Sequence, residues 1–248
     1  MARQNIYDDP AFFAGYATLP RFRHGLDAVF EWPAFRRMLP PSLQDLRVLD
    51  LGCGIGHFAR WARSQGAGHV LGVDLSEQML QRARTLGNDS AITYRRSALE
   101  DFVPDSDSFD LVTSSLALHY IADYALVVRR VTDCLVPGGR FVFSVEHPIF
   151  SARAAADWHI GPKGERLHWP VDYYLDEGAR QTHWFVDGVV RYHRTVETYV
   201  NGLIDAGLRL TRLAEPEAEG AFLAAWPEAV EERRRPPFLL LAADRPRL

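Results

Sequence analysis

The chain has 248 residues, of which 47% are hydrophobic and 24% charged, and its formal net charge is −4. This length is enough to bury a large core within one domain, and the acidic balance argues against a general polyanion-binding surface. The sequence has no apolar run of about 18 residues and no signal-peptide pattern, so we expect a cytoplasmic protein that binds neither a membrane nor nucleic acid.

Two helices are predicted ahead of the first strand, over residues 8–18 and 26–38. Pro10 suits an early helical position, and Pro40-Pro41 ends the second helix because proline cannot continue one. Strands and helices then alternate, which predicts a parallel sheet with helices on both faces. The predicted strands are 47–51, 69–74, 92–95, 109–114 and 140–146, and the predicted helices are 57–65, 76–86 and 123–134.

A glycine-rich turn follows the first predicted strand, in the string Asp50-Leu-Gly-Cys-Gly-Ile-Gly56. Its glycines allow a sharp turn, a close approach of backbone to a ligand, and exposed amides at a helix start. Asp74 ends the next strand, where a carboxylate can accept hydrogen bonds from both hydroxyls of a ribose. We therefore expect a ligand that contains a nucleoside. The run Gly54-Ile-Gly56-His-Phe-Ala59 also satisfies the looser dinucleotide pattern, so a nicotinamide cofactor stays open here.

The alternating pattern breaks after His147. Residues 149–193 are rich in tryptophan and tyrosine, and Asp187-Gly188 between two apolar runs predicts a hairpin turn. We expect this insertion to cover the carboxyl ends of the strands, where open α/β sheets bind ligands. A helix over 195–206 and strands over 208–213 and 238–243 complete the chain, and Arg233-Arg-Arg235 is expected to lie on a solvated helix.

The glycine string resembles the first motif of class I S-adenosylmethionine-dependent methyltransferases, with an acid before the first glycine. Three later segments extend the resemblance in the right order, over 97–101, 109–120 and 135–144. It implies a Rossmann-like seven-stranded α/β sheet with helices on both faces, an N-terminal helical lid, and an aromatic-rich insertion after the fifth strand. It also implies one domain, with the lid at 1–45, the cofactor-binding core at 46–148, the insertion at 149–193 and C-terminal helices and edge strands at 194–248.

In that family the acid and the glycine backbone serve the methionine part of S-adenosylmethionine, and the acid after the second strand holds the ribose. The resemblance thus implies this cofactor and a set of cofactor-binding residues. They are Tyr16, Arg21, Asp50, Gly52, Gly54, Gly56, Asp74, Leu75, Met79, Ala98, Leu99, Glu100, Ser114 and Leu116.

Candidate residues for the acceptor come from the lid, the strand ends and the insertion. As catalytic residues we expect Tyr7, His119, Glu146 and His147, and as substrate-binding residues Tyr7, Phe12, Tyr120, Trp158, Trp169 and Trp184. A structural role is the alternative for each: the tyrosines and tryptophans as packing, and His119 as a helix cap. The nine histidines are scattered and no paired C-x-x-C occurs, so no metal site is predicted.

Four short strings narrow the resemblance: Tyr7-Asp-Asp-Pro, Glu31-Trp-Pro, the run from Ser114 to Tyr120, and Val145-Glu-His-Pro. They are similar to a bacterial small-molecule subgroup that includes the azapteridine N-methyltransferases of toxoflavin biosynthesis. This implies methyl transfer to N or O of a small, planar heteroaromatic acceptor. The alternatives are a nicotinamide-dependent oxidoreductase, a methyltransferase acting on RNA or another macromolecule, and a non-catalytic cofactor-binding subunit. The sequence leaves the oligomeric state open.

Overall fold

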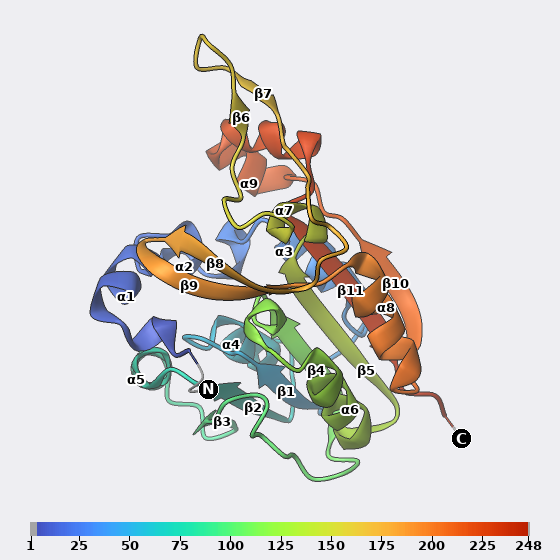
Figure 1. Cartoon of the computed structure of the whole chain (residues 1–248). Helices are drawn as coiled ribbons and strands as arrows, with labels where there is room; N and C mark the ends of the chain where they lie inside the picture. Colours follow the sequence, from blue (N-terminus) through green and yellow to red (C-terminus); the bar gives the residue numbers. More distant parts are fainter. Residues whose placement is uncertain (1–3, 248) are drawn as a thin grey trace.

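A computed structural model describes residues 4–247, with only the backbone described at residue 221. Its centre is a seven-stranded sheet in the order β10-β11-β5-β4-β1-β2-β3 (Figure 1). The strands of the parallel part are β1 Arg47–Leu51, β2 His69–Asp74, β3 Ile92–Arg96, β4 Phe109–Ser115 and β5 Leu135–Glu146. β11 (Phe238–Asp244) runs antiparallel to β5, and β10 (Arg209–Ala214) antiparallel to β11. The predicted α/β class, seven strands and antiparallel edge are confirmed.

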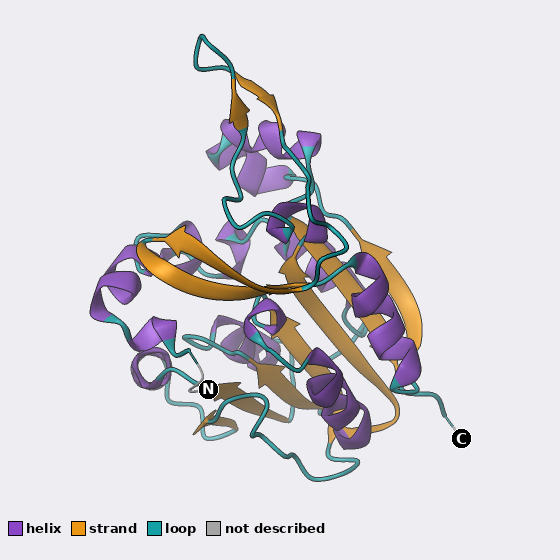
Figure 2. Ribbon diagram, viewed as in Figure 1, coloured by secondary structure: helices purple, strands orange, loops and turns teal. Residues whose placement is uncertain are grey.

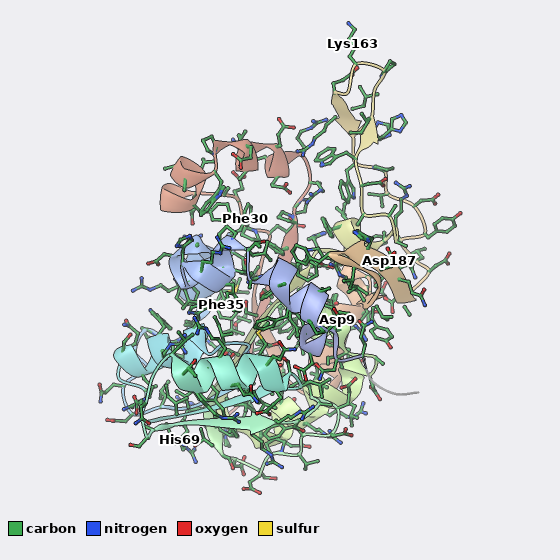
Figure 3. The ribbon with its side chains drawn as sticks, turned by 90° about the vertical axis from the view of Figure 1, so that its left-hand side faces the viewer. Asp9, Phe30, Phe35, His69, Lys163 and Asp187 are labelled. Carbon is green, nitrogen blue, oxygen red and sulfur yellow. The ribbon has the colours of Figure 1, made fainter. Side chains whose placement is uncertain are left out.

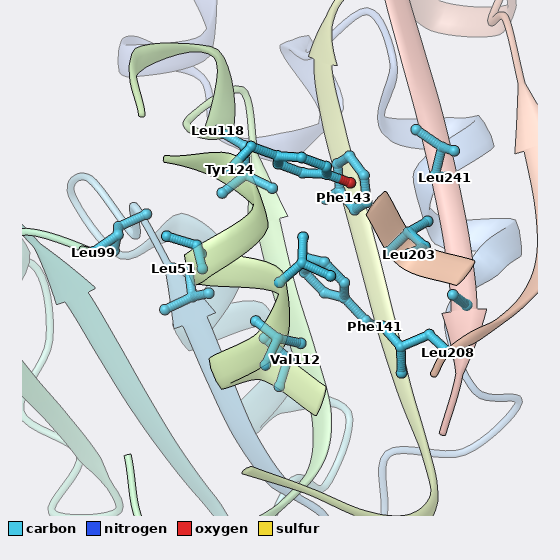
Figure 4. Close-up of a cluster of buried hydrophobic side chains, with 14 of the residues drawn as sticks. Leu51, Leu99, Val112, Leu118, Tyr124, Phe141, Phe143, Leu203, Leu208 and Leu241 are labelled. Atoms are coloured by element: carbon cyan, nitrogen blue, oxygen red, sulfur yellow. The ribbon is translucent and has the colours of Figure 1, made fainter. Parts of the chain in front are cut away.

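Helices cover both faces of the sheet (Figure 2). On one face, α6 (Tyr124–Cys134) and α8 (Val196–Asp205) pack on alternate side chains of the strands. Figure 4 shows Tyr124 and Leu203 of these helices against Phe141 and Phe143 of β5. On the other face, α3 (Trp32–Met38) and α4 (His57–Ser64) pack on the intervening strand positions. The two faces therefore use opposite halves of the period-two pattern, as a sheet buried on both sides requires.

The core helices lie close to their predicted bounds. α5 spans Glu77–Thr85, and its N-cap Ser76 accepts a hydrogen bond from the backbone N–H of Met79. Asp123 caps α6 in the same way, through the N–H of Leu126. These caps stabilise the helices because the serine or aspartate oxygen accepts a hydrogen bond from a first-turn N–H that has no acceptor within the helix.

The N-terminal segment differs from the two long helices that we predicted. It forms a chain of short elements: η1 Ile6–Asp8, α1 Pro10–Tyr16, α2 Pro20–Arg23, η2 Leu26–Ala28 and α3 Trp32–Met38. The prediction of one helix over 26–38 is wrong. The reason is Pro33, which has no backbone N–H to donate and so occupies the first turn of α3.

The insertion after β5 contains two hairpins. It begins with α7 (Pro148–Ser151), continues through β6 (His159–Ile160) and β7 (Arg166–His168), and ends with β8 (Gly178–Trp184) and β9 (Val186–His193). Figure 1 shows β8 and β9 lying across the end of the sheet toward α1 and α2, while β6 and β7 project from the body as an arm. Figure 3 places Lys163 at the tip of this arm, away from Asp9 at the start of α1.

The predicted β8–β9 hairpin exists, but its turn is not at Asp187-Gly188. Trp184 pairs with Val186, so the chain reverses at Phe185, which has a φ of 62°. Asp187 and Gly188 fall at a register shift within β9, where two residues oppose one on β8. Gly188 has a φ of 77°, the left-handed conformation that glycine adopts readily in a β-bulge.

Near the C-terminus, α9 (Gly220–Ala225) and the 3₁₀ helix η4 (Pro227–Arg234) lie beside the arm. Arg234 donates to the backbone carbonyls of Arg166 and Leu167. The expectation of a wholly solvated basic run is wrong at Arg235, which is buried. Within residues 4–247, no helix is long and apolar enough to span a membrane.

Candidate functional site

The loop between β1 and α4 brings the three predicted glycines together in left-handed conformations. Their φ angles are 73° at Gly52, 52° at Gly54 and 74° at Gly56. A Cβ at Gly52 would lie 2.3 Å from the Cβ of Ala117, and one at Gly56 would lie 2.1 Å from the hydroxyl of Tyr94. By contrast, a Cβ built at Gly54 would have no heavy atom of the described residues within 4 Å apart from those of Gly54 and its two chain neighbours. The loop thus packs tightly at both ends and presents bare backbone at its centre, which suits the approach of a ligand.

Asp74 lies at the carboxyl end of β2, directly beside this loop. Its two carboxylate oxygens accept hydrogen bonds from the backbone N–H groups of Gly54 (2.8 Å) and Ser76 (2.9 Å). Burial raises the pKa of Asp74, and the two backbone hydrogen bonds oppose that shift. The carboxylate is therefore fixed in position at the edge of the loop.

Asp50 lies under the loop within β1 and is only 3% exposed. It accepts a hydrogen bond from the hydroxyl of Thr113 on β4 (3.1 Å). Burial raises the pKa of Asp50 to about 7. A carboxylate in this position is costly to ionise alone, so a nearby cationic group would be stabilised there.

Arg21 of α2 reaches the same region from the N-terminal segment. Its guanidinium forms an ion pair with Glu31 (3.1 Å), which is 1% exposed and also accepts from Ser115 at the end of β4 (3.3 Å). Glu31, Asp50 and Ser115 line one small pocket between α3, α4 and the sheet. Glu31 is not among the site residues predicted from the sequence.

The remaining predicted cofactor residues lie along the carboxyl edge of the sheet. Met79 and Ala98 are buried, and the side chain of Leu99 belongs to the hydrophobic core. Leu75 accepts from Arg96 through its carbonyl, and Glu100 accepts from the backbone N–H of Ala122 (3.4 Å).

At the end of β4, Ser114 donates to the carbonyl of Leu51 and so joins two strands. Leu116 follows with a φ of 52°. A left-handed leucine is rare and is retained where the surrounding structure enforces it, often at a ligand site. The backbone N–H of Leu116 donates to the carbonyl and to the hydroxyl of Ser144 on β5.

The N-terminal segment is attached across the site at two points. Asp8 accepts from the Ser76 hydroxyl (2.5 Å) and from the backbone N–H of Gln78 (3.1 Å), at the N-terminus of α5. Gln4 donates to the carbonyl of Gly188 and accepts from the N–H of Val190, on the edge of β9. The segment therefore joins α5 to the β8–β9 hairpin over the carboxyl ends of the strands.

Five aromatic side chains pack together where the N-terminal segment meets the β8–β9 hairpin. The ring of Tyr7 meets those of Phe12, Tyr16 and Tyr120 edge to face, with centroids 4.9, 5.0 and 6.0 Å apart. Trp184 of β8 lies 5.2 Å from Phe12 and 5.8 Å from Tyr16. The hydroxyls of Tyr7 and Tyr120 are 3.4 Å apart. Burial raises the pKa of Tyr7 well above its usual range, so this phenol stays protonated.

Glu146, the last residue of β5, also faces this group. Its carboxylate pairs with Arg191 of β9 at 2.6 Å, and the Arg191 guanidinium lies 4.9 Å over the ring of Trp184. The backbone N–H of Glu146 donates to Nδ1 of His119 (3.4 Å). Burial holds the pKa of His119 well below its usual range, with Arg191 adding to the shift, so the imidazole is neutral.

His147 does not join this cluster, contrary to the prediction. Its Nδ1 accepts from the N–H of Ile149 and caps α7, and its Nε2 lies 2.8 Å from Glu215. Successive residues of a strand point to opposite faces, so Glu146 and its neighbour cannot both face the same cleft from an extended chain.

The three insertion tryptophans are also not together. Trp158 and Trp169 pack edge to face (5.4 Å) at the base of the arm, and the guanidinium of Arg235 lies 4.2 Å from the ring of Trp169 and 5.6 Å from that of Trp158. Trp158 and Trp169 therefore lie apart from Trp184, contrary to the prediction that the three rings gather around one acceptor. They fill an arm that has no core of its own, whereas Trp184 lies with the lid aromatics.

Three residues of the site were missed by sequence reasoning: Asp8, Glu31 and Arg191. Arg191 had a detectable signal, since Val189, Arg191 and His193 alternate along β9 and all three are buried. An arginine on the inward side of an alternating strand predicts a buried ionic partner.

Comparisons with known proteins agree with this geometry. Residues 49–143 match a family described as a methyltransferase domain. A crystal structure of an S-adenosylmethionine-dependent methyltransferase from Mesorhizobium loti is 52% identical, with a TM-score of 0.83 over 89% of this chain and 100% of that one. An uncharacterized protein of Haemophilus influenzae is 33% identical over 96% of each chain. A ubiquinone biosynthesis O-methyltransferase of Neisseria meningitidis is 37% identical over 42% of this chain and 45% of that protein.

The fold and the glycine loop define a class I methyltransferase. The chain belongs to the S-adenosylmethionine-dependent methyltransferases, and S-adenosylmethionine is its cofactor. The residues present fit this group: bare backbone at Gly54, a carboxylate beside it at Asp74, and a buried acid at Asp50. The comparisons therefore favour a methyltransferase over the nicotinamide oxidoreductase. Within the described part of the chain, no group of three or more His, Cys, Asp or Glu residues is placed to hold a metal ion.

Proposed function

We propose that this protein transfers a methyl group to a nitrogen or oxygen of a small, planar heteroaromatic metabolite. The observation that carries the proposal is the aromatic cluster of Tyr7, Phe12, Tyr16, Tyr120 and Trp184, which lies between the lid and the β8–β9 hairpin at the carboxyl ends of β4 and β5. Aromatic pairs contribute roughly 0.5–1.5 kcal/mol beyond simple burial, so a flat ring is the ligand that this cluster favours.

We assign the cofactor to the loop and to the acids around it. Asp74 would hold the ribose hydroxyls, and Gly54 would offer its backbone to the ligand. Asp50 would face the ammonium of the methionine part, and Arg21, oriented by Glu31, its carboxylate. The bound cofactor supplies an electrophilic methyl group on sulfur.

The protein's own contribution to the reaction is then orientation and the exclusion of water. Holding an acceptor lone pair in line with the methyl carbon is worth on the order of 7–11 kcal/mol. Tyr7 and Tyr120 stay protonated, and His119 stays neutral, so these groups would position the acceptor through hydrogen bonds. None of the three needs to act as a strong base when the attacking atom carries no proton that must leave at or before attack.

A methylation screen tests the proposal. The protein is incubated with isotopically labelled S-adenosylmethionine and three pools: planar heteroaromatics including azapteridines, aliphatic amines and acids, and transfer RNA. We expect labelled product in the first pool alone. An azapteridine product would identify the toxoflavin-type acceptor, and labelled RNA would replace the proposal with a macromolecular substrate.

Tryptophan fluorescence gives an independent test that uses the separation of the tryptophans. Planar heteroaromatics are expected to quench emission, and to do so at lower concentration when S-adenosylhomocysteine is already bound. A W184F variant should lose this quenching, and a W158F/W169F double variant should keep it because both rings lie at the base of the arm. Equal quenching by aliphatic acids would count against a planar acceptor.

A further inference from the structure

The ion pair between Glu146 and Arg191 leaves two polar atoms without hydrogen bonds. Glu146 Oε1 pairs with one terminal nitrogen of Arg191 at 2.6 Å. Among residues 4–247, no hydrogen-bond partner exists for the other carboxylate oxygen, Oε2, or for Arg191 Nε, although both atoms are buried. Buried polar atoms are almost always paired, because an unpaired one destabilises the folded protein.

The position of these two atoms points to a ligand. Glu146 ends β5 at the carboxyl edge of the sheet, next to the backbone contact with His119. Arg191 is 6% exposed and is covered by Trp184. Burial raises the pKa of Glu146, which Arg191 opposes, and both Glu146 and Arg191 act electrostatically on Tyr120. The unpaired acceptor and the unpaired donor thus belong to the aromatic cluster that we assign to the methyl acceptor.

The Glu146–Arg191 pair as a whole carries no net charge, and this favours a ligand group that is also neutral. A carboxylate would satisfy Arg191 and repel Glu146, whereas an ammonium would do the reverse. Either one would leave a buried charge uncompensated, which is strongly unfavourable. A neutral group that both donates and accepts would satisfy Oε2 and Nε without changing the charge of the site.

We propose, on the basis of the function proposed above, that Glu146 and Arg191 recognise the amide-like edge of a neutral planar heterocycle, a ring N–H next to a ring carbonyl. The ring N–H donates to Glu146 Oε2, and the carbonyl oxygen accepts from Arg191 Nε. The nitrogen bound to Glu146 keeps its proton, so the methylated atom lies on another edge of the ring. Glu146 and Arg191 are then specificity-determining residues and take no proton during transfer.

Ligand binding to the full chain with S-adenosylhomocysteine bound tests this. The probes are bicyclic rings of similar size: carbostyril, which has the N–H and the carbonyl; N-methylcarbostyril, which lacks the donor; and quinaldate, which is an anion. For the wild type we expect carbostyril to bind at least about tenfold more tightly than either of the others, as hydrogen bonds to charged groups imply.

Two variants change the selectivity in different directions. In E146Q the charge of Arg191 is no longer compensated, so quinaldate should become the preferred probe. In the E146M/R191M double variant both charges are absent, and the preference for carbostyril over N-methylcarbostyril should disappear. The double variant avoids a lone buried charge and so guards against misfolding. S-adenosylhomocysteine affinity, measured by calorimetry, should be unchanged in both.

The outcomes separate this inference from the proposed function. If all planar probes bind the wild type equally, or if E146Q does not shift the preference toward quinaldate, the inference is wrong and the planar acceptor stands. If no planar probe binds while S-adenosylhomocysteine does, the planar acceptor and the inference both fall.

Discussion

Asp50 is a carboxyl group with almost no contact with solvent, held by one hydroxyl and beside a second acid, Asp74. Its pKa of about 7 lies above the ordinary value of 3.8, so the folded protein binds this proton more tightly than the unfolded chain does. This tighter proton binding stabilises the folded state fully below about pH 4, and the stabilisation is lost as the pH rises through about 7.

We therefore expect Asp50→Asn to remove one source of pH dependence in the cofactor-free protein. Relative to the wild type, the variant should become more stable as the pH rises from about 4 to 7, because an amide cannot ionise. Urea unfolding at several pH values measures this difference. A difference that is constant across that range would show that folding does not raise the pKa of Asp50.

Asp74 differs from Asp50 because both of its oxygens are fixed by backbone N–H groups at the cofactor loop. We predict that Asp74→Ala weakens the binding of S-adenosylmethionine by about 1.5–3 kcal/mol, the range for hydrogen bonds to a charged group. Asp74→Asn, which keeps an acceptor oxygen, should lose less. Calorimetric titration measures both, with the exposed Asp205→Ala on α8 as control. Wild-type affinity in Asp74→Ala would remove the ribose assignment.

At the scale of elements, the N-terminal end of the lid is held by Gln4 and Asp8. Asp8 attaches η1 to the N-terminus of α5, where a carboxylate also interacts favourably with the helix dipole, and Arg96 lies 3.8 Å away. The hydrogen bonds to Ser76, Glu77 and Gln78 hold the pKa of Asp8 below its usual range despite partial burial. The covering of the site thus depends on a contact between two elements about seventy residues apart.

We predict that Asp8→Ala speeds the release of S-adenosylhomocysteine about fivefold, because losing a cap of this kind costs about 1 kcal/mol. Stopped-flow displacement measures the rate. Glu77→Ala is the matched control, since its side chain pairs with Arg84 on the same helix and leaves the Asp8 contacts in place. Equal release rates in wild type and Asp8→Ala would mean that the N-terminal segment does not limit cofactor exit.

At the scale of the whole molecule, we propose that the chain is one folding unit despite its projecting arm. The lid, the β8–β9 hairpin and the sheet share the contacts of Asp8, Gln4 and Glu146, and α8 packs into the same core as α6. The arm is joined to the C-terminal segment by Arg234 and Arg235.

One cooperative unfolding transition is therefore expected, with coincident curves by circular dichroism and tryptophan fluorescence. S-adenosylhomocysteine at one hundred times its dissociation constant should stabilise the whole transition by about 2.7 kcal/mol. Two separated transitions, of which the ligand shifts only one, would divide the chain into independent domains.

The sequence by itself determined the cofactor loop and the architecture around it. Asp50, the three glycines and Asp74 lie on a strand, a turn and a second strand that are close in sequence, and period-two and helical patterns are local properties. Such patterns predict which elements form and which edge of the sheet receives the ligand. The exceptions were local as well: Pro33 shortened a predicted helix, and Gly188 proved to be a bulge instead of a turn.

Only the tertiary structure decided which side chains lie together at the proposed acceptor site. Glu146 meets Arg191 across 45 residues of sequence, and Trp184 lies apart from Trp158 and Trp169. These pairings depend on how the insertion crosses the sheet and on the register of the β8–β9 hairpin, in which a shift of one residue would turn Arg191 to the opposite face. Residue patterns along the chain do not encode that crossing, because it follows from packing between segments that are distant in sequence.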